Sequence, residues 1–595
     1  MRVVAPSPSL PRAYPHPAAP SGRGRPLPRR LSGFILFFGV LVAPLSRSGR
    51  RMVGRAGEGK GEGADGGWLA LSLAGSILTG LVLRLWNLRA QVMGGDELHA
   101  VRAAARLSLP EILTTFSVTD FSIPLTALDR VLLSAGVTLS EIGFRLPALL
   151  CGCAALHVLP RVFLGEIDRR TAALFGWLIA LSPGLVLYSR IARSYLPMLL
   201  AGLVAVMAFE AWWRTRERRY TLLYLGAGGL AVWLHLGAGP LVVAPFLFAL
   251  GDLVRQPESR WRRLMELVAL GCGLCLALAA FLVPARASLL ALVASKREEG
   301  QRVPLSAVSD VLKLQAGTAS AIVTVLFWLV VLTGLVLLVR DRPRFGAFTL
   351  TVAVGHLAGL LALSPLGLAQ PLILNRYLLP VLPLVLLWLA YALGRLWKMA
   401  GCACLLILFL TGPFPSPGFR TSSFVHHNDF VGFFAPLSTL PADVVPEIYH
   451  RLPRGPVLEA PWPTVWDFCR SFYVYQGIHG QPVLVSAPRD LPRVPGISFR
   501  NEVPPDPAAY LASRARTLIV HLRLPWEEDR VIDPPARPGR PLRPALRRAL
   551  REDGEALAAR LTAAWGPPDF RDATVETWDL ERVRRAAGPT APPPR

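Results

Sequence analysis

Residues 194–219 read SYLPMLLAGLVAVMAFEAWWRTRERR, and this stretch decides the fold class. Residues 194–212 are almost all apolar, and about 20 such residues form a helix that crosses a bilayer. Basic residues gather at the cytoplasmic ends of membrane helices. The stretch therefore predicts a transmembrane helix whose carboxyl end faces the cytoplasm, where the sequence places Arg214, Arg216, Arg218 and Arg219.

The same pattern recurs along the chain. Of its 595 residues, 52% are hydrophobic and 17% are charged, whereas soluble globular domains average about 25% charged residues. This composition excludes an ordinary soluble protein and a disordered one. The apolar stretches predict about eleven spans: 68–88, 146–165, 171–188, 194–212, 221–238, 240–254, 264–283, 319–339, 345–363, 377–394 and 399–413.

Arginines set the predicted orientation. Every second connection between spans is basic, from Arg169 and Arg170 after the second span to Arg395 and Lys398 after the tenth. The positive-inside rule places these connections and the N-terminus in the cytoplasm. The net charge of +24 is then explained by these connections and a basic N-terminal segment. A nucleic-acid partner is not predicted, because no contiguous basic surface motif is present.

The pattern predicts an α-helical polytopic membrane protein with a small α/β domain outside the membrane. Residues 1–67 are rich in Pro, Gly and Arg and predict a disordered extension, residues 68–413 a transmembrane domain, and residues 586–595 a disordered tail. Residues 414–585 alternate between short strands and helices, which is typical of an α/β domain. The expected strands are 455–460, 472–475, 482–486 and 517–521, and the expected helices are 507–516 and 542–565.

The first outward loop, residues 89–145, carries the most polar motif. Gly94-Gly95-Asp96-Glu97 precedes the helix-forming segment LHAVRAAARL. Asp96 suits the N-cap of that helix, with His99 on the same face. A purely structural role, in which Asp96 caps the helix and Glu97 complements its dipole, is the alternative. Asp120 follows, and then residues 125–137 predict a short helix lying along the membrane surface.

These motifs, read in order, resemble the polytopic GT-C membrane glycosyltransferases of the protein O-mannosyltransferase and aminoarabinose transferase group (family 39/83-like). The resemblance covers about residues 68–413. A further stretch, Tyr475-Gln476-Gly477-Ile478-His479-Gly480-Gln481-Pro482, resembles outward tails of bacterial GT-C-like proteins. The matching motifs are Asp96-Glu97, Asp120 with Pro124-Leu125, Ser140-Glu141 with Arg145-Leu146-Pro147, Tyr188-Ser189-Arg190-Ile191-Ala192-Arg193-Ser194-Tyr195, and Asn375-Arg376-Tyr377-Leu378-Leu379-Pro380.

The resemblance implies transfer of a sugar from a polyprenyl-phosphate donor to a lipid, glycan or protein acceptor. This reaction would take place at the outer face of a bacterial cytoplasmic membrane. A carboxylate must take the acceptor proton, and cations must stabilise the phosphate that leaves. The implied roles are Asp96 as catalytic base, Glu97 and Asp120 as acceptor or metal contacts, Arg190, Arg193 and Arg376 as phosphate ligands, and Tyr188, Tyr195, Tyr377 and His479 as neighbours of the site.

One departure from the group keeps alternatives open. The group often has His-Pro or Lys-Pro where this chain has Ser122-Ile123 before Pro124-Leu125. A non-catalytic member, or a polytopic transporter or flippase of lipid-linked or glycan substrates, is therefore a rival reading. No internal repeat of the kind common in transporters is evident. The sequence requires no cofactor, and the three carboxylates are compatible with a divalent cation.

Overall fold

The computed structural model describes a large part of the chain. Asp96, Asp120, His479, residues 1–61, the predicted span 399–413 and the predicted strand 472–475 lie outside the described residues. The described residues are 62–86, 88, 97–116, 122–255, 260–297, 303–318, 320–363, 368, 371–395, 446–461, 481–486, 496–497, 502–522 and 544–588.

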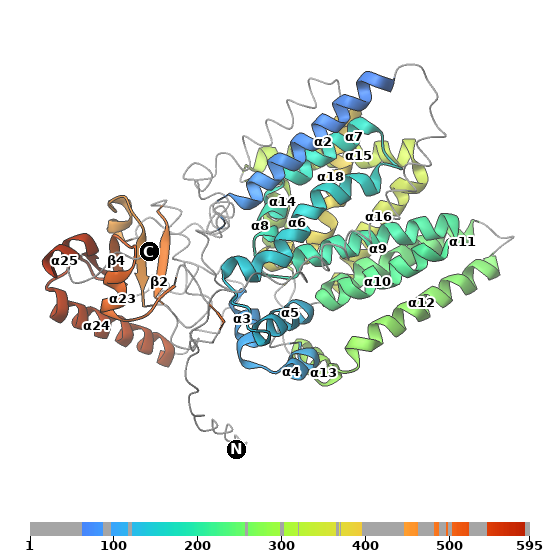
Figure 1. The fold of residues 1–595 in the computed structure, drawn as a ribbon. Helices are drawn as coiled ribbons and strands as arrows, with labels where there is room; N and C mark the ends of the chain where they lie inside the picture. The colour runs from blue at the N-terminus through green and yellow to red at the C-terminus, as the bar shows by residue number, and fades with distance from the viewer. Residues whose placement is uncertain are drawn as a thin grey trace. The chain divides into compact units, whose positions relative to one another are not determined.

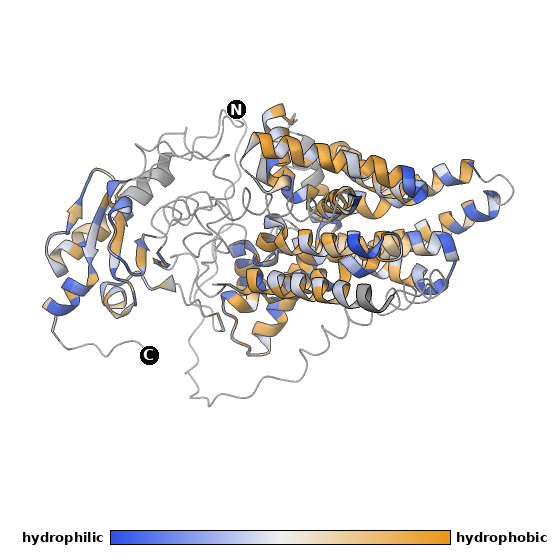
Figure 2. Ribbon diagram, turned by 90° about the horizontal axis from the view of Figure 1, so that it is seen from above, coloured by the Kyte–Doolittle hydropathy of each residue, from blue (hydrophilic) through white to orange (hydrophobic). Residues whose placement is uncertain are grey.

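Helices make up nearly all of the described chain up to residue 395. Figure 1 shows the longest of these helices running side by side, and Figure 2 shows hydrophobic residues along their lengths. In chain order they are α2 (Glu62–Leu85), α3 (Glu97–Arg106), α4 (Leu109–Thr114), α5 (Ile123–Ser134), α6 (Glu141–Phe163), α7 (Arg169–Leu181), α8 (Pro183–Ser189), α9 (Tyr195–Thr215), α10 (Arg218–Leu234), η3 (Leu236–Ala238), α11 (Gly239–Val254), α12 (Arg260–Leu282), α13 (Arg286–Arg297), α14 (Leu305–Ala316), α15 (Ala321–Asp341), α16 (Pro343–Leu363), α17 (Pro371–Leu378), η5 (Leu379–Val381) and α18 (Leu382–Arg395).

Every predicted span from 68–88 to 377–394 is helical in the structure. Within the described residues, eight helices are long and apolar enough to cross a membrane, and α7 with α8 forms a ninth candidate that bends by 56°. The bend lies at Ser182-Pro183, where proline cannot continue the hydrogen bonding of a helix. The prediction of an α-helical polytopic membrane protein is confirmed.

Burial separates the central helices from those that face lipid. In the most apolar 18-residue stretch of each helix, 94% of the residues are buried in α9, against 17% in α12. Large apolar side chains on the outer helices are exposed, with Leu276 at 74% and Ile322 at 74%. A soluble protein rarely exposes so much contiguous apolar surface, so these faces fit the hydrocarbon of a bilayer.

Small residues let the helices approach closely. A Cβ atom added at Gly334 on α15 would overlap the carbonyl oxygen of Trp388 on α18. The indole N–H of Trp388 in turn donates to the hydroxyl of Thr349 on α16, at 3.1 Å. Close packing through glycine is the usual way that membrane helices associate.

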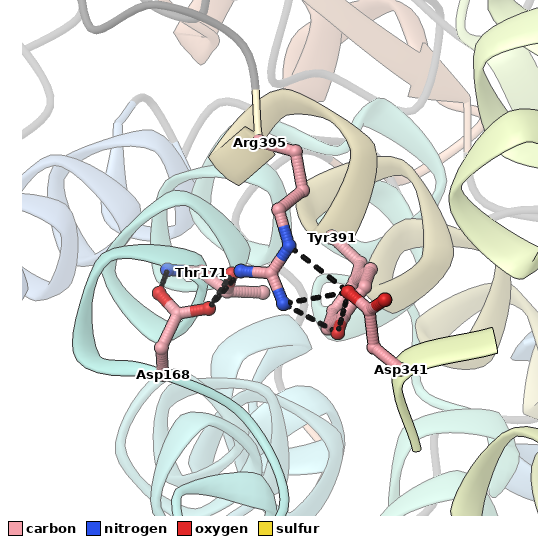
Figure 3. A network of polar contacts seen from close by, with 5 residues as sticks. All are labelled: Asp168, Thr171, Asp341, Tyr391 and Arg395. Carbon is pink, nitrogen blue, oxygen red and sulfur yellow. Dashed lines mark hydrogen bonds and ion pairs between the residues drawn. The ribbon is translucent and has the colours of Figure 1, made fainter. Parts of the chain in front are cut away.

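A polar network joins three helices at their basic ends (Figure 3). The Arg395 guanidinium bonds Asp168 at 3.1 Å and Asp341 at 3.0 Å. Asp168 also caps α7, because its carboxylate accepts the backbone N–H of Thr171 at 2.9 Å. Tyr391 donates its hydroxyl to Asp341 at 3.0 Å. The network links the start of α7 to the ends of α15 and α18.

The described residues after 445 form a small α/β domain. Its six-stranded sheet has the order β3-β2-β1-β4-β6-β5, in which β6 is antiparallel to both neighbours and the other pairs are parallel. The elements are η8 (Glu447–His450), β1 (Val457–Ala460), β2 (Val483–Ser486), β3 (Glu502–Val503), α23 (Pro507–Ala512), β4 (Thr517–His521), α24 (Pro544–Trp565), β5 (Phe570–Arg571), β6 (Val575–Asp579) and α25 (Leu580–Ala586).

The predicted strands at 455–460, 482–486 and 517–521 and both predicted helices are present in this domain. The sequence interpretation placed no element at β5, β6 or α25. The prediction of a small α/β domain is confirmed, and its core includes Leu458, Leu518 and Trp578. One buried carboxylate, Glu459 on β1, is satisfied by His521 Nε2 at 2.7 Å and by the hydroxyl of Tyr449.

Candidate active site

The start of α3 is fixed by a buried ion pair. Glu97 and Arg145 form two parallel contacts of 2.9 Å between carboxylate and guanidinium, and both side chains are fully buried. Glu97 Oε1 also accepts the backbone N–H of Ala192 at 2.7 Å. The pair therefore holds three segments together: the outward loop, the entry of α6 and the turn between α8 and α9.

Arg190 stabilises the carboxyl end of α2. Its Nη1 atom donates to the carbonyl oxygens of Arg84 at 2.7 Å and Trp86 at 2.9 Å. Arg84 lies in the last turn of α2 and Trp86 directly follows the helix, where backbone carbonyls have no partner within the helix. Arg84 reciprocates, because its Nε donates to the hydroxyl of Ser189 at 3.1 Å. Arg190 thus supports the same turn that Glu97 holds.

Arg193 and Arg376 meet at one aromatic ring. The guanidinium carbon lies 5.6 Å from the centroid of the Tyr195 ring for Arg193 and 5.9 Å for Arg376. Both distances are typical of cation–π contacts. Tyr188 packs edge-on against Tyr195, with ring centroids 5.2 Å apart. The tertiary fold therefore joins two arginines that lie far apart in the sequence.

His235 adds an imidazole ring to this cluster. It lies at the break between α10 and η3, and its ring centroid is 5.7 Å from Tyr195 and 5.7 Å from Tyr377. Since Nδ1 accepts the backbone N–H of Gly237 at 3.0 Å, the ring proton of the neutral form lies on Nε2. His235 can therefore act as a hydrogen-bond donor.

Gly237 is required by this arrangement. A Cβ atom at this position would lie 2.9 Å from His235 Nδ1 and 3.0 Å from a ring carbon of Tyr377. The backbone of Tyr377 is held from the other side, where His356 Nε2 contacts its carbonyl oxygen at 2.9 Å. The beginning of the last described span is thus packed tightly against His235.

Helix α5 connects the loop that follows α4 to the segment around His235. A helix was predicted over residues 125–137, and α5 covers Ile123–Ser134; its position along the membrane surface stays a prediction. Ile123, in its first turn, belongs to an apolar cluster with Phe116, against which Trp233 and Leu236 pack. Those last two residues flank His235 in the sequence. The first turn of α5 therefore packs on the segment that carries His235.

The structure brings together Arg193, Arg376, Tyr188, Tyr195 and Tyr377, all named from the sequence. Glu97 and Arg190 lie next to this cluster and carry structural contacts. Asp96, Asp120 and His479 are outside the described residues, although α3 begins at Glu97, directly after Asp96. The sequence interpretation did not single out His235 as a functional residue. The predicted spans place it at the same membrane face as Arg193, and this position could have indicated it. Among the described residues, no group of three His, Cys, Asp or Glu side chains could hold a metal ion.

Comparison with known proteins gives structural neighbours only. No family model matches the chain, and no curated protein matches its sequence. The fold is similar to the crystal structure of ArnT from Cupriavidus metallidurans in the apo state, with 16% identity, 72% of this chain and 87% of that chain covered, and a TM-score of 0.41. A second ArnT structure, bound to undecaprenyl phosphate, gives 14% identity, 76% and 92% coverage, and a TM-score of 0.40.

Proposed function

We propose that this chain is a membrane glycosyltransferase that uses a polyprenyl-phosphate-linked sugar donor. The observation that carries the proposal is the pair of arginines, Arg193 and Arg376, at the Tyr195 ring. Arginine binds phosphate through paired N–H groups. The predicted topology places both at the outer face, where the positive-inside rule makes arginines less expected.

In the proposed reaction, an acceptor hydroxyl attacks the anomeric carbon of the sugar. Asp96 takes the hydroxyl proton as the new carbon–oxygen bond forms. The bond between that carbon and the phosphate oxygen breaks, and polyprenyl phosphate leaves with the bonding electrons. Arg193 and Arg376 stabilise its growing negative charge, and the Nε2 proton of His235 is a further donor.

Arg190 and Glu97 have supporting roles in this proposal. Arg190 donates to the end of α2 and Glu97 pairs with Arg145. Both therefore position the turn that carries Arg193, and we assign the phosphate contact to Arg193 and Arg376. The outer-face orientation in a bacterial cytoplasmic membrane, and the identity of the sugar and acceptor, belong to the proposal as well.

The test uses purified full-length protein and undecaprenyl phosphate, with binding followed by tryptophan fluorescence. We expect R193Q and R376Q each to weaken binding by about tenfold or more, because a hydrogen bond to a charged group contributes about 1.5–3 kcal/mol. R340Q, on an exposed residue at the basic end of α15, is the matched control and should bind normally. D96N should bind undecaprenyl phosphate but release none from sugar-linked donors.

Two results would contradict the proposal. Equal binding of undecaprenyl phosphate by wild type, R193Q and R376Q would remove the phosphate site. Release of the same amount of polyprenyl phosphate by wild type and D96N would remove the catalytic role of Asp96. Movement of an intact lipid-linked sugar across proteoliposomes, without its hydrolysis or transfer, would favour the flippase alternative.

A further inference from the structure

Three polar side chains along α5 are buried, and two of them are hydroxyls without a partner among the described residues. Ser122 is 1% exposed, Thr126 is fully buried and Asp129 is 5% exposed. The hydroxyl oxygens of Ser122 and Thr126 have no hydrogen-bond partner in the described part of the chain, and Ser122 does not cap the helix with its side chain. Buried polar groups in proteins are nearly always hydrogen-bonded.

The three side chains lie on one face of the helix. Their spacing of four and three residues places them in a row along α5, about 10 Å long at 1.5 Å per residue. Two other side chains of α5 already have partners. Arg130, the next residue along, donates to the carbonyl oxygen of Ala104 at 3.4 Å, and Ile123 packs in the apolar cluster. The polar row is therefore a distinct feature of the helix.

The position of the row relates it to the arginine cluster. Its first member, Ser122, precedes Ile123, whose apolar cluster includes the two residues that flank His235. Helix α5 also packs against α3, which begins directly after Asp96. The row thus starts where α5 packs on the segment that carries His235, and it runs along the helix that packs on α3.

The chemistry of the row fits a neutral, hydroxyl-rich ligand. Two hydroxyls can each donate and accept a hydrogen bond. Burial raises the pKa of Asp129 well above its ordinary value, so its carboxyl group favours the protonated form, which also donates and accepts. A single carboxyl with two hydroxyls is a poor cage for a divalent cation, which takes six or more oxygen ligands. Sugar hydroxyls likewise offer both donors and acceptors.

We propose that Ser122, Thr126 and Asp129 form a subsite that binds the hydroxyl groups of the transferred sugar. This inference rests on the proposed function, since the sugar must lie next to the phosphate to which it is bonded. It also assigns a role to Ser122, which stands where the related group often carries His or Lys. The three side chains then help to determine which sugar is transferred.

The test compares undecaprenyl phosphate with undecaprenyl-phosphate-linked glucose, mannose and arabinose, using purified full-length protein. At least one sugar-linked lipid should bind more tightly to wild type than undecaprenyl phosphate does. T126V and D129L should reduce that preference about tenfold, or about 1.4 kcal/mol, and leave binding of undecaprenyl phosphate unchanged. The control is T114V, at an exposed position on α4 in the same loop, which should keep the preference of wild type.

Thermal unfolding separates recognition from a structural role. T126V removes a buried hydroxyl that has no hydrogen-bond partner among the described residues, and D129L removes a buried carboxyl group, so their melting temperatures should equal or exceed that of wild type. The inference is overturned if either variant unfolds at lower temperature, if the sugar preference is unchanged, or if no sugar-linked lipid binds more tightly than undecaprenyl phosphate. Failure of wild type to bind any of the four lipids would instead overturn the proposed function, and this inference with it.

Discussion

The ion pair between Glu97 and Arg145 shows how single residues determine the site. Both side chains are fully buried, and the carboxylate also accepts the N–H of Ala192. Removing one partner of such a pair leaves an uncompensated charge and costs about 3–5 kcal/mol. Replacing both partners can restore stability, because the charges no longer need to leave water. This difference separates a structural role of Glu97 from a direct contact with the acceptor.

We expect R145M alone to lower the melting temperature of the purified protein strongly, and E97Q to do so as well. The double variant E97Q/R145M should recover most of the lost stability, because the introduced amide oxygen still accepts the Ala192 N–H and no charge remains. If Glu97 is only structural, sugar transfer should recover in the double variant. Recovery of the melting temperature without recovery of transfer would indicate an acceptor contact.

At the scale of helices, the network around Arg395 joins α7, α15 and α18 (Figure 3). Arg395 is 40% exposed, and its partners Asp168 and Asp341 are 42% and 35% exposed. Solvent-exposed ion pairs contribute about 0–1 kcal/mol each, and salt screens them. The network therefore sets the register of three helix ends more than it stabilises the fold.

For R395A we expect a loss of stability of about 1 kcal/mol or less, measured as a small fall in melting temperature in low-salt buffer. The difference from wild type should shrink in high-salt buffer. R395K should show a similar loss, because lysine lacks the fork that reaches both carboxylates. Binding of undecaprenyl phosphate should not change, since α7 and α18 meet this network at the ends away from Arg193 and Arg376. A large and salt-independent loss would contradict this account.

At the scale of the whole molecule, the two ends of the long helices differ in their charged residues. At the end of α9, Arg214 pairs with Glu166 in the connection between α6 and α7 at 2.6 Å, and at the start of α16, Arg344 lies 3.6 Å from Glu210 on α9. The candidate site lies at the opposite ends of the same helices. The positive-inside rule then predicts that the arginine-rich ends are cytoplasmic and the site is outside.

Fusion proteins in a bacterial host test this orientation. Alkaline phosphatase joined after Arg595 should be active, because the eleven predicted spans, counted from a cytoplasmic N-terminus, would place the α/β domain outside. The same enzyme joined within the connection at residues 214–219 should be inactive, and a fluorescent protein there should fold. Reversed activities would place the site in the cytoplasm, and a polyprenyl-phosphate donor at the outer face would then be excluded.

Local sequence was sufficient where one physical rule dominates. Apolar length predicted the long helices between α2 and α18, because a bilayer leaves few alternatives to a helix with all backbone groups bonded. Alternation of apolar runs predicted β1, β2 and β4. Strand β6 was missed, because its buried residues include Glu576 and Thr577 and their pattern looks polar. The 56° bend between α7 and α8 at Ser182-Pro183 was also not predicted, although proline is known to interrupt helices.

The sequence by itself determined the membrane fold, its spans and the arginines and tyrosines at span ends, because hydrophobicity and charge act through each residue's own chemistry. Only the tertiary structure decided which of them meet. Arg193 and Arg376 share one aromatic ring, His235 packs against both Tyr195 and Tyr377, and Glu97 pairs with Arg145. Such contacts depend on how helices distant in the chain pack, and no local pattern encodes that packing. The polar row on α5 belongs to the same class, because burial of its side chains exists only once the fold has formed.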